Sequence, residues 1–198
     1  TIDLHSPQIQ GFFKKPVDNL YAHPLLCEFI KTRNIPDLVV VSPDAGFARN
    51  ARRYASYLKV PVFICEKTRK DHSEQAEVRD LFGPVRIKNA LIVDDFTITC
   101  GTLIETANVV KLKGAEKIYA MVTHALLDDK AIEALDKSNI CELIVTDTVD
   151  NPRIKNSKKI TQITVAPFFA EAVKIIENKG SLSKLFDSLP KKMLKSCF

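Results

Sequence analysis

The sequence has no long apolar run. No stretch of the chain approaches the roughly 20 apolar residues that a membrane-spanning helix needs. Its first residues also lack the basic, apolar and small-residue segments of a secretory signal peptide. With 45% hydrophobic and 27% charged residues, the composition is that of a globular protein in water. We therefore expect a cytoplasmic protein that does not bind membranes.

Paired cysteine motifs are also missing. The five cysteines are odd in number and none forms a CxxC pair. This argues against structural zinc and against a disulfide framework, and indicates free thiols in a reducing compartment.

Sequence signatures of nucleic-acid binding are absent as well. The net charge of +5 is modest, and it suits a small phosphorylated ligand as well as it suits nucleic acid. Because neither an RNP-type motif nor a helix-turn-helix motif is present, we expect no nucleic-acid partner.

What the sequence does contain is an alternation of strand-like and helix-like segments. Helical spacing of apolar residues covers 47–59, 102–114 and 128–138. Apolar runs rich in β-branched residues lie at 37–42, 60–65, 90–95, 117–124, 142–147 and 160–166. This βαβ pattern predicts an α/β fold, a parallel sheet flanked by helices. The charged stretch 66–88 has no clean period, and its length suggests a lid or a disordered connection.

The run "LIVDDFTITCGTL" at 91–103 concentrates chemistry at the end of one predicted strand. Ligands of parallel sheets bind at the carboxyl ends of the strands. A turn rich in N–H groups and hydroxyls before a helix can hold one phosphate. The carboxylates of Asp94 and Asp95 can each accept a hydrogen bond from a sugar hydroxyl, and a phosphate beside a diol describes ribose 5-phosphate. A solvated pair at a strand end is the alternative.

A second strand end repeats this arrangement in "VVVSPDAGFARNARR" at 39–53. Asp44 is expected at the same sheet edge as Asp94, while the arginines that follow also fit a solvated helix face.

His5 is a candidate magnesium ligand or phosphate contact, although an isolated histidine is more often packed or on the surface. Lys67 and Arg69 would project the same way from an extended lid, and a solvated charge run is the alternative.

Eight motifs together resemble those of one family. They are "DLHSPQIQGFF", "PVDNLYA", "VVVSPDAG", "EKTRK", "LIVDDFTITCGTL", "MVTHALL", "VTDTV" and "VAPFFAEAVKII". In this order and spacing, the chain resembles the C-terminal portion of ribose-phosphate diphosphokinase, the enzyme that makes phosphoribosyl pyrophosphate. The resemblance runs from about residue 3 to about residue 187, and it implies a fold like that of the type I phosphoribosyltransferases.

The resemblance also implies residue roles. Asp94 and Asp95 would hold the ribose hydroxyls, and Asp44 and His5 would bind Mg²⁺. Lys67 and Arg69 would act as catalytic residues of the flexible loop. The 5-phosphate loop would comprise Thr97, Ile98, Thr99, Cys100, Gly101 and Thr102. A possible regulatory phosphate or ADP region would include Gln10, Asn19 and Tyr21.

The chain departs from the family pattern at several points. Ile98 stands where the family has an acidic residue, and Phe47 replaces the second glycine of "SPDxGG". The flexible loop is slightly longer than in the family. The resemblance further implies an N-terminal domain with most of the ATP contacts, to which segment 1–22 would belong, followed by the phosphoribosyltransferase-like domain 23–178 and a tail, 179–198.

The expected function is the transfer of diphosphate from Mg-ATP to ribose 5-phosphate by a homo-oligomer, with little activity from these residues alone. The alternative is a non-catalytic regulatory homologue, or a truncated form, that keeps the sugar-phosphate site. A phosphoribosyltransferase would fit the acidic pair but not "DLHSPQIQGFF".

Overall fold

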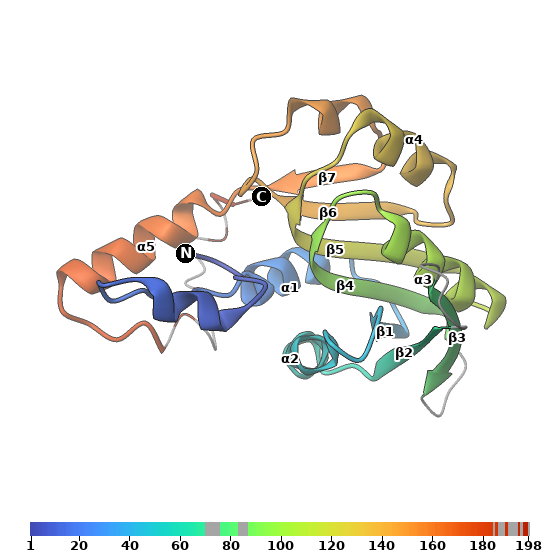
Figure 1. The fold of residues 1–198 in the computed structure, drawn as a ribbon, viewed down its shortest axis with the longest axis horizontal. Coiled ribbons are helices and arrows are strands. Elements are labelled where there is room, and N and C mark those ends of the chain that lie inside the picture. Colours follow the sequence, from blue (N-terminus) through green and yellow to red (C-terminus); the bar gives the residue numbers. More distant parts are fainter. Residues whose placement is uncertain are drawn as a thin grey trace.

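A computed structural model shows the fold (Figure 1) and describes residues 1–69, 76–82 and 87–183, with Leu185, Leu189, Leu194, Ser196 and Cys197. Within these residues, one sheet has the strand order β3-β2-β1-β4-β5-β6-β7. The strands are β1 (Leu38–Ser42), β2 (Val62–Arg69), β3 (Ala76–Phe82), β4 (Asn89–Thr97), β5 (Lys117–Ala125), β6 (Glu142–Thr146) and β7 (Ile160–Ile163).

All six predicted strands are confirmed, and they pair in parallel. The region 66–88 differs from the expectation, because β2 continues to Arg69 and β3 pairs with it in an antiparallel hairpin. The expected lid or disordered connection, 66–88, includes 70–75 and 83–86, which lie outside the described residues. The α/β class is confirmed, with one antiparallel edge strand added.

Helices cover both faces of the sheet. They are α1 (His23–Lys31), α2 (Ala48–Leu58), α3 (Gly101–Leu112), α4 (Asp129–Lys137) and α5 (Ala166–Glu177), with the 3-10 helices η1 (Pro7–Phe12) and η2 (Pro152–Asn156). Side chains of α1, α2 and α5 share one core with Leu91 and Val93, whereas α3 and α4 share the other with Ile92. Successive residues of a strand point to opposite faces, so the apolar run of β4 is buried on both sides.

The two ends of the chain pack on the first of these cores. Ile2 and Leu20 form a parallel bridge and are buried there. Leu185 is buried in the same core, which attaches the tail to the domain. Phe12 and Phe13 remain 87% and 59% exposed. The assignment of 1–22 to a further domain stays a prediction.

Candidate functional site

The carboxyl ends of β1 and β4 bring three carboxylates to one cavity. Asp44 follows β1, Asp94 and Asp95 lie near the end of β4, and the two strands are parallel neighbours. With His5 and the turn after β4, these residues line a cavity of about 290 Å³. Asp44 and Asp94 therefore emerge at the same sheet edge, as the sequence predicted.

The acidic pair is held by backbone hydrogen bonds. The Asp95 N–H donates to Asp94 Oδ1 at 3.0 Å, and the Phe96 N–H donates to Asp95 Oδ1 at 2.9 Å. Burial, and next the negative charge of Asp95, raise the pKa of Asp94 to about 7. The site therefore favours a ligand that offers hydroxyl donors or positive charge to Asp94.

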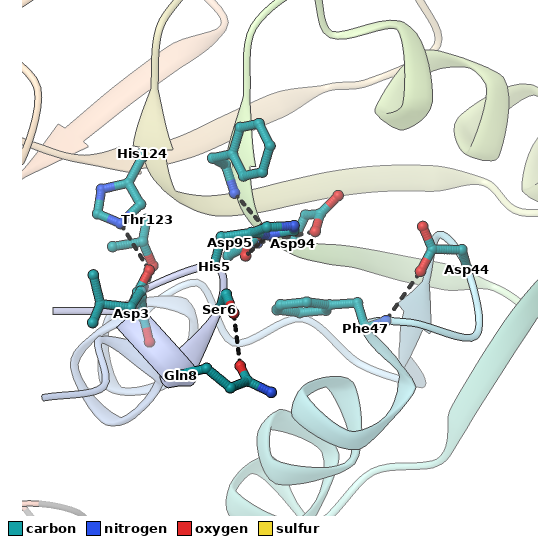
Figure 2. A network of polar contacts seen from close by, with 12 residues as sticks. Asp3, His5, Ser6, Gln8, Asp44, Phe47, Asp94, Asp95, Thr123 and His124 are labelled. Carbon is teal, nitrogen blue, oxygen red and sulfur yellow. Dashed lines mark hydrogen bonds and ion pairs between the residues drawn. The ribbon is translucent and has the colours of Figure 1, made fainter. Parts of the chain in front are cut away.

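His5 reaches this pair from the other end of the sequence (Figure 2). Its Nδ1 lies 2.7 Å from Asp95 Oδ2, and its ring meets that of Phe96 edge-on, with centroids 5.1 Å apart. The His5 side chain is nevertheless 73% exposed. It is therefore a surface histidine that is held in place through one ring nitrogen.

The turn between β4 and α3 is held by its own threonine hydroxyls. The Cys100 N–H donates to Thr97 Oγ1 at 3.1 Å, and the Gly101 N–H donates to Thr99 Oγ1 at 3.2 Å. Cys100, in the left-handed region with φ 60°, reverses the chain and caps α3. The turn is thus preformed at the N-terminus of a helix, where an anion is stabilised. Ile98 is 53% exposed at its tip.

The loop after β1 is similarly tight. Asp44 Oδ1 accepts the Phe47 N–H at 3.0 Å, and a Cβ on Gly46 would lie 3.2 Å from that same oxygen. Phe47 has a φ of −88°, so no glycine is needed there, and its side chain is buried in the first core. The loss of the family's second glycine therefore leaves the Asp44 loop intact.

Lys67 and Arg69 are placed only through their backbone. They pair with Val78 and Ala76 in the β2–β3 hairpin. Their side chains lie outside the described part of the chain, so their catalytic role stays a prediction.

The three residues assigned to a regulatory site do not form one cluster. Gln10 donates to Pro7 O at 3.0 Å within the first 3-10 helix. Asn19 is buried, and its Oδ1 accepts the Leu4 N–H at 3.2 Å. Tyr21 lies under the Arg53 guanidinium, with the centroid 4.7 Å from Cζ. Tyr21 lines a cavity near the site, and the regulatory role of the three residues stays a prediction.

That cavity, of about 420 Å³, adjoins the first one, since His5 and Asp95 line both. Arg49 and Arg53 line it and contribute positive charge, and Arg49 is exposed, as the alternative of a solvated helix face expects. Burial, and then the charge of Arg53, lower the pKa of His23 to about 4, and His23 is therefore neutral at pH 7.

Sequence reasoning missed three residues that support the site. Phe96 contacts the His5 ring, while Asp3 and Thr123 join the N-terminal segment to β5 by a hydrogen bond of 2.6 Å. All three stand inside motifs quoted from the sequence: Asp3 in "DLHSPQIQGFF", Phe96 in "LIVDDFTITCGTL" and Thr123 in "MVTHALL". The contact with Thr123 spans 120 positions, and no local pattern reports it.

Comparisons with known proteins agree with this geometry. Residues 78–187 match the family described as Phosphoribosyl synthetase-associated domain. The ribose-phosphate pyrophosphokinase of Oceanobacillus iheyensis is 42% identical over 187 residues, which cover 94% of this chain and 59% of that protein. The chain belongs to the ribose-phosphate pyrophosphokinase family.

Further members support this assignment. The enzyme of Bacillus caldolyticus is also 42% identical, with the same coverage of 94% and 59%. The crystal structure of phosphoribosylpyrophosphate synthetase from Mycobacterium smegmatis superposes with a TM-score of 0.80 at 34% identity, and covers 90% of this chain and 58% of that one. The chain thus spans about three fifths of the length of these pyrophosphokinases. Within its described residues, none of the helices has the length and apolar character needed to cross a membrane.

Proposed function

We propose that this chain provides the ribose 5-phosphate half of a ribose-phosphate pyrophosphokinase, which transfers diphosphate from Mg-ATP to ribose 5-phosphate. One observation carries the proposal: the acidic pair and the turn at the N-terminus of α3 line the same cavity of about 290 Å³. A sugar phosphate needs these two kinds of group at its two ends. The relatives reported above are named as the enzyme, so the non-catalytic homologue is the less favoured alternative.

Binding would orient the sugar between these groups. The 5-phosphate would accept hydrogen bonds from the turn and the first turn of α3. Asp94 and Asp95 would accept hydrogen bonds from the ring hydroxyls. This fixes the direction of the 1-hydroxyl before it attacks the β-phosphorus of ATP in line, and such positioning supplies much of the catalysis of phosphoryl transfer.

The donor set near Asp44 suits Mg²⁺. Magnesium is usually bound by one or two carboxylates, with water and substrate phosphate completing the octahedron. Asp44 is fixed by the Phe47 N–H and lines the cavity together with His5. No group of three or more His, Cys, Asp or Glu side chains in the described residues could hold a metal without substrate. Bound there, Mg²⁺ would supply positive charge to the diphosphate.

The remaining charge neutralisation is assigned to Lys67 and Arg69 at the end of β2. Transfer of a diphosphoryl group moves several negative charges, and cations placed beside them lower the barrier.

The exposed Phe12 and Phe13 support the further proposal of a homo-oligomer, because large apolar side chains on a surface favour a protein partner.

Two measurements test the proposed function. Calorimetry should show that the purified chain binds ribose 5-phosphate more tightly than ribose. AMP release from Mg-ATP should require ribose 5-phosphate, and should be slow for these 198 residues and faster for any longer form of the chain. Equal affinity for ribose and ribose 5-phosphate would contradict the sugar-phosphate site. AMP release without a sugar acceptor would contradict the transfer.

Ile98→Asp restores the family's acidic side chain at the tip of the turn. We expect it to raise the rate of AMP release about 10–100-fold, because a hydrogen bond to a charged group contributes about 1.5–3 kcal/mol. Ile98→Asn is the matched control, since it is polar but uncharged. An equal gain in both variants would assign the effect to lost apolar surface and not to the carboxylate.

A further inference from the structure

Asp3 makes hydrogen bonds through its backbone N–H, its backbone carbonyl and its carboxylate. Its N–H donates to Leu20 O at 2.9 Å, and its carbonyl accepts from His124 Nε2 at 3.1 Å. Its Oδ2 accepts from Thr123 Oγ1 at 2.6 Å and from the Ala22 N–H at 3.0 Å. One residue thereby joins three parts of the chain: the first residues, the start of α1 and the end of β5.

These partners belong to a rigid part of the fold. Thr123 is fully buried in β5, a strand paired on both sides. His124 is fixed in turn, because its Nδ1 lies 2.8 Å from Thr148 Oγ1. A segment that is fastened to such a strand end has little freedom to shift along the sheet edge.

The link from Asp3 to the site is short. His5 follows it by two residues, and the intervening Leu4 N–H donates to Asn19 Oδ1 at 3.2 Å. Consecutive Cα atoms are about 3.8 Å apart, so the position of Asp3 limits where His5 can lie. At the end of this link, His5 Nδ1 lies 2.7 Å from Asp95 Oδ2 (Figure 2). Both residues line both cavities.

Backbone conformation adds a second constraint. Asp3 has a φ of 41°, in the left-handed region that favours glycine, asparagine and aspartate. The hydrogen bonds of the carboxylate hold this bend, which directs the following residues towards β4. A residue without a side-chain acceptor would leave the Ala22 and Thr123 donors unpaired in a buried place, at a cost in stability.

We infer that Asp3 is a positioning residue of this site: its hydrogen bonds to β5 and α1 hold His5 against Asp95. Asp3 lines the cavity of about 420 Å³ but not the cavity of about 290 Å³ proposed for the sugar phosphate, and it acts on the latter through His5. The consequence for substrate binding rests on the proposed function, whereas the placement of His5 does not.

The first experiment needs no ligand. A nuclear Overhauser effect between the rings of His5 and Phe96, whose centroids are 5.1 Å apart, reports the placement of His5. It should be present in the wild type and in Asp3→Asn, which keeps an acceptor and tolerates the positive φ. It should be lost in Asp3→Gly, which tolerates the φ but has no acceptor. Persistence of the effect in a folded Asp3→Gly protein would overturn the inference.

Thr123→Val is a second variant for the case that Asp3→Gly does not fold. It keeps the shape of Thr123 and removes only its donor to Asp3. The ring effect should weaken in this variant, and an unchanged effect would overturn the inference.

The second experiment measures ribose 5-phosphate affinity in a double-mutant cycle. Asp3→Gly should weaken binding about tenfold, because His5 holds Asp95, the proposed acceptor of a ribose hydroxyl, and loss of a residue behind a binding side chain typically costs about 10–100-fold. In a His5→Ala background it should have no further effect. The same tenfold loss in that background would overturn the inference. If the wild type binds no ribose 5-phosphate, the proposed function fails while the ring measurement still decides the role of Asp3.

Discussion

Ribose 5-phosphate should bind about 10²–10⁴-fold more weakly to the double variant Asp94→Ala/Asp95→Ala, which removes both acceptors, than to the wild type. Each carboxylate is expected to accept a hydrogen bond from a sugar hydroxyl, and a hydrogen bond to a charged group contributes about 1.5–3 kcal/mol. Two such bonds give about 3–6 kcal/mol, which corresponds to this range of affinities. Isothermal titration calorimetry at pH 8 is the measurement, because Asp94 is then largely ionised.

The control for this variant is Asp129→Ala on α4. The Asp129 side chain is 78% exposed and belongs to neither cavity, so its loss of charge should leave the affinity unchanged. If the double variant loses less than about threefold in affinity, as Asp129→Ala should, the pair does not bind the sugar.

The largest effect on stability is expected from Asp94→Asn alone. Burial and the charge of Asp95 raise the pKa of Asp94 from 3.8 to about 7 in the folded protein. The folded state therefore binds the proton more tightly than the unfolded state does. It follows that the wild type loses stability as the pH rises from about 4 to about 7, and the loss is complete above the folded pKa.

Asparagine does not titrate, so Asp94→Asn escapes this loss. We expect its free energy of unfolding at pH 8 to exceed that of the wild type by about 2–4 kcal/mol. Urea denaturation at pH 5 and pH 8 measures the difference, which should be clearly smaller at pH 5. The same difference at both pH values would show that the buried charge of Asp94 is not its cause.

These two predictions run in opposite directions, which is typical of a functional site. A pair of buried carboxylates lowers the free energy of unfolding of the folded chain. Such a destabilising pair is typical of a site that binds a ligand. Hydroxyl donors or a cation bound at the cavity would offset the repulsion between Asp94 and Asp95.

Much of the fold could be predicted because its signals are local. The β-branched runs and the helical spacing depend only on neighbouring residues, and they located all six parallel strands and the helices α2, α3 and α4. The strand β3 could not be predicted in this way. Its stretch is highly charged, and its pairing with β2 is a tertiary property of an edge hairpin.

The sequence by itself determined where the chemistry lies along the chain: an acidic pair and a hydroxyl-rich turn at one strand end, and a carboxylate at another. Parallel pairing brings such ends to one sheet edge, so the shared cavity of Asp44, Asp94 and the turn could be foreseen.

Only the tertiary structure decided what surrounds this cavity. The contact of His5 with Asp95 spans 90 positions, and that of Asp3 with Thr123 spans 120. The raised pKa of Asp94 depends on burial by the folded chain. Contacts of this kind are set by how the N-terminal segment crosses the sheet edge, and no local pattern of residues encodes that path.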